Sequence, residues 1–251
     1  MKAILKGIIL SLIVPLFVAC DFDHDDDYVV QNYYVDIATV KNPDSLSTFF
    51  FRLDNDKLMW TATTNYYNYR PKDGQRIVAY YSILSDKRAT GLYDYDVRLN
   101  NAYTVLTKGI FKISPSTQDS IGNDSISISE IWMGSDYLNV EFRYIGYNQI
   151  HYINLVSDAS KIYTDGKVHL EFRHNANGDT PNYYRQGIVS FDLKSLQAAT
   201  SNKTLNLVIH VNVPNQVEEK TYSLTYSFDS NPLMIKSPKI SFPEELGNQI
   251  K

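Results

Sequence analysis

Residues 93–100 read YDYDVRLN, so that Tyr, Val and Leu alternate with Asp, Arg and Asn. Successive side chains of a β-strand point to opposite faces, and this alternation therefore predicts a strand with one buried and one solvated face. The same period of two recurs at 138–143, 168–173 and 205–211. Because no segment carries a sustained helical stripe, we predict an all-β protein.

Turn signals divide the first strands of the chain. Asp, Asn and Asp at 54–56 lie between two apolar runs and predict a hairpin. PKDG at 71–74 predicts a second turn, because proline fixes one dihedral angle and Gly74 permits a positive φ. Further strands are expected at 33–38, 77–83 and 93–100, and a strand at 103–107 could close the set. Five short strands are the number in a small OB-type barrel, and we expect an OB-like domain at 28–110.

The alternation breaks at 114–125, where Pro, Gly, Ser, Asn and Asp accumulate, and we expect a linker at 111–125. A second series of short strands follows, separated by turn signals, which is typical of a β-sandwich. We assign this domain to 126–240, with a turn of helix within 193–199. Residues 241–251 are expected to form an irregular tail.

The N-terminus has the features of a secretory signal peptide over residues 1–19. Lys2 and Lys6 precede an apolar run that is shorter than the ~20 residues a membrane-spanning helix needs. The chain has one cysteine, Cys20, so an internal disulfide is excluded. The residues before it, FVA, resemble a lipobox in which Phe17 replaces the usual leucine. Fatty acylation of Cys20, with palmitate, is the preferred interpretation; the alternative is a secreted protein with an incidental cysteine.

A run of five aspartates follows the cysteine and is expected to form a solvated, acidic tether at 20–27. These residues are Asp21, Asp23, Asp25, Asp26 and Asp27. Calcium is rejected, because Asp26 and Asn32 stand where a calcium loop needs Gly and Glu. The run resembles the surface-export signal of some Gram-negative anaerobes, which predicts an outer-membrane, cell-surface location. In other bacteria Asp21 would retain the protein in the inner membrane, so this expectation depends on lineage.

The charge balance argues against nucleic acid as a partner. The formal net charge is −4, and loss of Lys2 and Lys6 with the leader takes it to −6. An acidic body gains nothing from the release of phosphate counterions. The expected partners are the membrane, through the lipid anchor, and a protein, peptide or glycan of unknown identity.

No catalytic motif is present, and we predict no catalytic residue, no cofactor and no metal site. His169 and His174 are five residues apart, so on one strand they face opposite sides. Paired carboxylates such as Asp94 and Asp96 leave an enzyme as the third interpretation, but they have the pattern of a solvated strand face.

Two groups of residues are candidates for ligand binding. The first is polar, at the end of a predicted strand: Glu171, Arg173, His174, Asn175, Asn177 and Asp179. The second consists of tyrosines in expected loops: Tyr66, Tyr67, Tyr69, Tyr183 and Tyr184. The alternative for the polar group is a wet sheet face whose charges pair across strands. The alternative for the tyrosines is a half-buried position in the core.

Several motifs follow one another in an order that resembles the NigD-like family. They are DIATV at 36–40, YRPKDGQR at 69–76, DSIGND at 119–124, IWMG at 131–134, DYLNV at 136–140 and LEFRHN at 170–175. This resemblance covers nearly the whole mature chain and implies an OB-like domain followed by a β-sandwich domain. It also implies a role in bacteriocin production or immunity, and no catalytic residues.

We therefore expect a surface-exposed, non-enzymatic lipoprotein that binds a macromolecular partner, as a bacteriocin-associated immunity or accessory factor. The alternative is a glycan-binding lipoprotein that captures polysaccharide. Fold alone does not decide between them.

Overall fold

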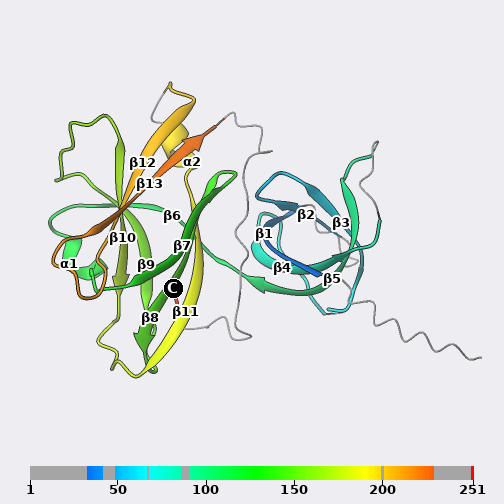
Figure 1. The fold of residues 1–251 in the computed structure, drawn as a ribbon, viewed down its shortest axis with the longest axis horizontal. Helices are drawn as coiled ribbons and strands as arrows, with labels where there is room; N and C mark the ends of the chain where they lie inside the picture. The colour runs from blue at the N-terminus through cyan, green and yellow to red at the C-terminus, as the bar shows by residue number, and fades with distance from the viewer. Residues whose placement is uncertain (1–32, 42–48, 67, 86–90, 199–200, 229–249) are drawn as a thin grey trace, which may run out of the picture. The chain divides into compact units, whose positions relative to one another are not determined.

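The computed structural model describes residues 33–41, 49–66, 68–85, 91–198, 201–228 and 250–251. It confirms the all-β prediction, with strands β1 to β13 and two helices of a single turn (Figure 1). The predicted lipidation and export residues, Cys20 and the five aspartates, lie outside the described residues, as does Tyr67. None of the helices in these ranges is long and apolar enough to cross a membrane.

The first five strands close into a barrel in the order β1-β2-β3-β5-β4. They are β1 (Tyr33–Lys41), β2 (Phe50–Leu53), β3 (Leu58–Thr64), β4 (Arg76–Ile83) and β5 (Tyr95–Thr104). Asp56 (φ 62°) in the β2–β3 turn and Gly74 (φ 74°) before β4 have positive φ, so both predicted turns are confirmed. Ile77, Ala79 and Tyr81 share the inner face of β4 and are buried, as their spacing predicted.

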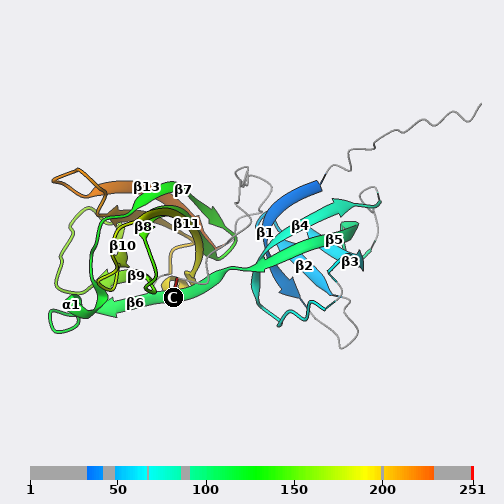
Figure 2. The same cartoon turned by 90° about the horizontal axis from the view of Figure 1, so that it is seen from below.

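The remaining strands form one sheet in the order β13-β12-β10-β9-β6-β11-β8-β7. They are β6 (Leu106–Ile113), β7 (Ser127–Gly134), β8 (Tyr137–Gly146), β9 (Tyr152–Asp158), β10 (Val168–Asn175), β11 (Tyr183–Asp192), β12 (Thr204–Val211) and β13 (Lys220–Ser227). Helix α1 spans Gln118–Ile121 and α2 spans Lys194–Gln197, the latter inside the predicted helical turn. Figure 2 shows these strands around a common interior, which Leu138, Val140 and Phe172 help to fill.

Strand β6 belongs to both halves of this sheet. Its first half pairs in parallel with β11 (Leu106 opposite Val189), and its second half pairs in parallel with β9 (Ile110 opposite Leu155). A strand that switches between two packed layers in this way forms a corner of a sandwich. The expected linker at 111–125 is therefore corrected: β6 continues to Ile113, and α1 follows within the segment.

The strand expected at 103–107 is also corrected. β5 ends at Thr104 and β6 begins at Leu106, so one apolar run serves two strands in different sheets. Val105 between them is buried, and its amide donates to the carbonyl of Arg76. No Gly, Pro, Asn or Asp at 103–107 marks this change of sheet.

A buried arginine joins the barrel to the second sheet. The Arg76 guanidinium on β4 donates to Asp54 (Nη1–Oδ1 2.5 Å, Nη2–Oδ2 2.9 Å) and to Asn139 Oδ1 on β8 (3.0 Å). Asn139 Nδ2 in turn donates to Asp54 Oδ2 (2.9 Å), and the guanidinium lies 4.3 Å from the ring centre of Tyr137. The Arg76 and Asp54 side chains are 0% and 2% exposed. The polar face predicted for β8 is therefore buried at Asn139, because it meets this ion pair.

Candidate functional site

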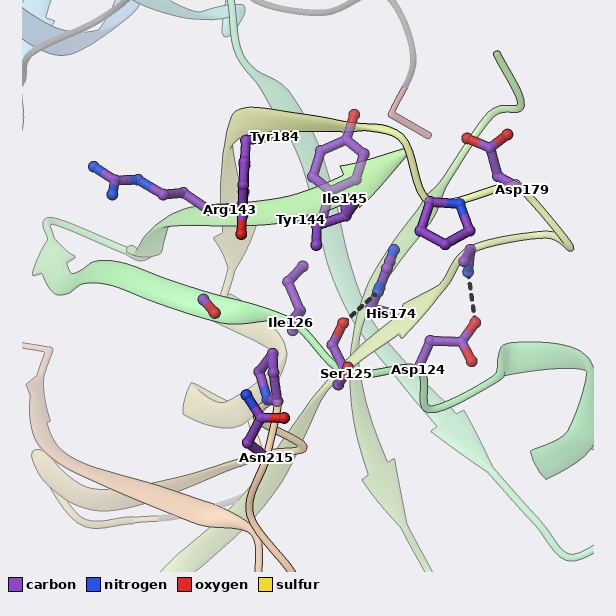
Figure 3. A pocket seen from close by; sticks show the side chains of 14 residues that line it. Asp124, Ser125, Ile126, Arg143, Tyr144, Ile145, His174, Asp179, Tyr184 and Asn215 are labelled. Atoms are coloured by element: carbon purple, nitrogen blue, oxygen red, sulfur yellow. Dashed lines mark hydrogen bonds between the residues drawn. The ribbon is translucent and has the colours of Figure 1, made fainter. Parts of the chain in front are cut away.

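A cavity of about 660 Å³ opens at one end of the second sheet (Figure 3). It lies where β7 begins, where β8 and β10 end, and beside the start of β11 and the β12–β13 connection. Ile126, Tyr144 and His174 are buried residues of its lining, whereas Arg143 and Tyr184 are exposed. Tyr184 is 85% exposed, so its ring is available to a ligand at this opening.

A chain of hydrogen bonds lies along the wall of the cavity. Asp179 Oδ2 is 3.1 Å from His151 Nε2, and His151 Nδ1 is 2.7 Å from His174 Nε2. His174 Nδ1 donates to the carbonyl of Ser125 (3.2 Å), a bond drawn in Figure 3. Asp179 also accepts from the amides of Tyr147 and Asn148, so it fixes the β8–β9 connection.

The direction of the outermost hydrogen bond in this chain is fixed by chemistry. The Ser125 carbonyl can only accept, which places a proton on His174 Nδ1. The other nitrogen of His174 faces His151 Nδ1, so the two rings are joined through one shared hydrogen bond.

Burial and these hydrogen bonds shift the pKa values of the groups around the cavity. Burial, followed by the neighbouring His151, lowers the pKa of His174. Burial alone would raise the pKa of Asp179, but hydrogen bonds from the Tyr147 amide and the His151 ring hold it well below its usual range. The Tyr144 phenol has its pKa raised, chiefly by burial.

The groups at the cavity suit the binding of a ligand. His174 uses both ring nitrogens in structural hydrogen bonds, and its contact with Ser125 is to the carbonyl rather than to the hydroxyl. In the described ranges, no group of three or more His, Cys, Asp or Glu side chains could hold a metal ion. What the cavity offers is an aromatic rim, apolar walls and the charged side chains of Asp124 and Arg143.

The structure brings some of the predicted polar residues to the cavity and separates others from it. His174 and Asp179 line it, whereas Glu171, Arg173 and Asn175 alternate with His174 and point from the other face of β10. Arg173 Nε donates to Glu171 (2.6 Å), and Lys161 completes a largely buried cluster. The alternative of a wet face with charges paired across strands is therefore wrong for Glu171 and Arg173, which are buried and pair along one strand. Lys161 reaches Glu171 from outside β10, with its side chain 38% exposed.

Asn175 supports α1 instead of facing a ligand. Its side-chain amide donates to the carbonyl of Ser120 (3.3 Å) and lies against Gly122, where φ is 73°. Asn177 also has a positive φ (55°) and is exposed in the turn after β10.

The predicted tyrosines are in three different environments. Tyr184 lines the cavity, whereas Tyr183 is absent from its lining and is 6.1 Å from Tyr147, ring centre to ring centre. In the barrel, Tyr66 stacks on Tyr69 (5.0 Å between ring centres), and Tyr69 packs edge-on against Phe49. Burial raises the pKa of Tyr69. Tyr69 is therefore a packing residue of the barrel.

His151 was not predicted as a site residue. It reaches His174 only because β9 and β10 pair antiparallel, with Ile153 opposite His174, and no local motif signals this contact. The prediction that His169 and His174 face opposite sides is confirmed. His169 Nδ1 instead lies 2.9 Å from His210 Nε2, and the His169 ring stacks on Tyr163 at 3.6 Å.

Comparisons with known proteins place this geometry in a family. The model of the NigD-like N-terminal OB domain matches residues 37–105, and that of the NigD-like C-terminal beta sandwich domain matches residues 109–226. A search of curated proteins gives no match.

Three solved structures are similar to the chain. A protein of unknown function from Bacteroides vulgatus is 30% identical with a TM-score of 0.70, covering 88% of this chain and all of its own. A protein described as toxin-related from Parabacteroides distasonis is 31% identical (TM-score 0.68; 79% of this chain and 95% of its own). A NigD-like immunity protein from Bacteroides caccae shares the fold at 19% identity (TM-score 0.62; 78% and 97%). The two family models together cover well over half of the sequence, and the chain belongs to the NigD-like family.

Proposed function

We propose that this protein is a lipid-anchored binding protein of the outer cell surface that holds part of a macromolecular partner in the cavity of its second sheet. The cavity at the end of β8 and β10 carries the proposal, because it combines exposed Tyr184 with apolar walls and charged side chains. Sites of this kind, mostly apolar with a few placed polar groups, are typical of binding pockets. The hydrogen-bonded histidines beside it hold its wall in place.

The partner we favour is a bacteriocin or a component of its secretion, which the protein would neutralise or assist. The immunity protein from Bacteroides caccae shares this fold, and the relative from Parabacteroides distasonis is described as toxin-related. Anchoring through Cys20 would hold the cavity where a secreted antimicrobial meets the cell.

A protection assay tests this proposal. A deletion strain would be challenged with culture supernatants of related bacteriocin-producing strains and complemented with the wild type, Tyr184→Ser or Tyr183→Ser. We expect the wild type and Tyr183→Ser to protect and Tyr184→Ser to lose protection, because only Tyr184 lines the cavity. Equal protection by both variants would refute a role for the cavity.

Glycan capture is the second candidate, favoured by the exposed ring of Tyr184 beside the Asp124 carboxylate. A glycan array probed with the soluble mature chain tests it. Binding that is lost in Tyr184→Ser and retained in Tyr183→Ser would support this function in place of the first.

A further inference from the structure

Strand β9 has a backbone edge that is filled by the chain's own last two residues. The amide of Lys251 donates to the carbonyl of His151 (3.0 Å), and the amide of Ile153 donates to the carbonyl of Lys251 (2.9 Å). Ile250 forms a parallel bridge with His151. Figure 1 marks this end of the chain with the letter C.

The edge exists because β6 changes layers. On this side of β9, β6 pairs only with Leu155 to Asp158, since its first half pairs with β11. Alternate residues of a strand point their amide and carbonyl groups to the same side. The backbone groups of His151 and Ile153 therefore point to the side of β9 on which β6 pairs further along the strand. We call this strand position beside residues 151–153 the lane. Buried backbone groups need partners, so this lane requires a strand of some kind.

A pocket for one apolar side chain accompanies the lane. Ile250 packs against the core cluster that contains Phe142. Gly187 on β11 leaves the space for it: a Cβ at 187 would lie 3.3 Å from Ile250 Cδ1 and 2.6 Å from Phe142 Cζ. The lane thus recognises an extended backbone with an apolar side chain at the position of Ile250.

One residue, His151, connects the lane to the lining of the cavity. His151 pairs its backbone with residues 250–251, while its ring bonds to His174 and Asp179 of the cavity lining. A polypeptide strand that takes the place of residues 250–251 therefore pairs with a residue that supports the cavity wall. A glycan has no amide ladder with which to do this.

We propose that this lane is an acceptor site for an extended polypeptide strand, which the chain's own residues 250–251 fill until a partner's strand displaces them. The inference rests on the proposed function, because it identifies the partner of the cavity as a polypeptide that also pairs with β9. Strand addition to an open edge is a common mode of peptide recognition. Among the described residues, the resident segment is held to β9 by the bridge between Ile250 and His151.

Amide hydrogen exchange in the full mature chain tests the proposal, with Cys20→Ala to keep the protein free of lipid. Ile250→Asp places a charge in the apolar pocket and should release the segment. We expect the Ile153 amide to exchange at least about tenfold faster, while the core amides of β8 keep their protection. Ile250→Ala, a milder change, should give a smaller increase. The matched control is Ile162→Asp, since Ile162 is 88% exposed and its replacement should leave Ile153 unchanged.

A synthetic amidated peptide with the sequence of residues 241–251, SFPEELGNQIK, then serves as the probe. At millimolar concentration it should restore protection of Ile153 in Ile250→Asp, and a peptide with Asp at position 250 should not. An Ile153 amide that stays protected in Ile250→Asp, or one that the peptide cannot protect, would overturn the proposal.

The two proposals fail in different ways. If the peptide protects Ile153 but Tyr184→Ser still protects cells, the acceptor site stands and the cavity function fails. If Tyr184→Ser abolishes protection and the peptide has no effect on Ile153, the cavity function stands and the strand site is refuted.

Discussion

Replacing Arg76 with alanine should be among the most destabilising single changes in this chain. The substitution removes every guanidinium donor from Asp54 and Asn139 and leaves a carboxylate that is 2% exposed without its cation. Breaking a buried ion pair in this way typically costs about 3–5 kcal/mol. For a domain of this size, that loss lowers the melting temperature by roughly 10 °C.

Urea unfolding of the soluble mature chain, followed by tryptophan fluorescence and circular dichroism, measures this loss. Arg52→Ala is the matched control, because its ion pair with Asp56 (3.6 Å) is 38% exposed on both sides. Pairs of that kind contribute about 0–1 kcal/mol. Since Arg76 joins two sheets, its loss should also separate the unfolding of barrel and second sheet into two transitions. A cost for Arg76→Ala no larger than that of Arg52→Ala, with one transition, would refute the reasoning.

Four further outcomes are expected. Cys20→Ala should abolish fatty-acid labelling and release the protein from the membrane fraction; persistent labelling would refute the cleavage site. Alanine at positions 23, 25, 26 and 27 should preserve lipidation but hide the protein from protease added to whole cells, and unchanged cleavage would leave these residues only a tether role. Burial raises the pKa of the Asp36 carboxyl, which accepts a hydrogen bond from Tyr81 (2.8 Å). Asp36 is therefore protonated more readily in the folded state than in the unfolded state, and the stability of the folded protein falls as pH rises. Asp36→Asn should therefore be more stable than the wild type near pH 7, and no more stable below pH 3.9, which is about the pKa of Asp in an unfolded chain. Thermal unfolding across pH measures this, and a difference in melting temperature that stays constant with pH would contradict it. Residues 126–240 expressed alone lack β6 and should show no protected amides, whereas residues 104–251 should be protected; protection in the shorter fragment would show that β6 is dispensable.

The alternation of apolar and polar residues predicted most strands, because one face of each is buried in its own module. It failed where a second layer covers the other face. Asn139 was expected on a polar face, yet it is fully buried, since Arg76 from another part of the chain meets it there. Glu171 and Arg173 were also expected on a polar face and are buried. Their charges are tolerated there because they pair with each other, and Glu171 also pairs with Lys161.

The site was predictable only in part. Tyr184 and His174 were recognised by type and position, and both line the cavity. His151 could not be assigned to it, because its contact depends on the register between β9 and β10. The strand edge at β9 was equally hidden, since it arises from the path of β6 and not from any property of residues 151–153.

The path of β6 also sets an order of events for a chain that is synthesised from its N-terminus. The barrel strands pair among residues 33–104 and can close as soon as that portion is complete. β6 is made next, but its partners at 155–158 and 189–192 do not yet exist. During this interval β6 is an exposed edge of the kind that invites aggregation. Distant parallel pairings of this kind also form slowly, so the second sheet is expected to fold after the barrel.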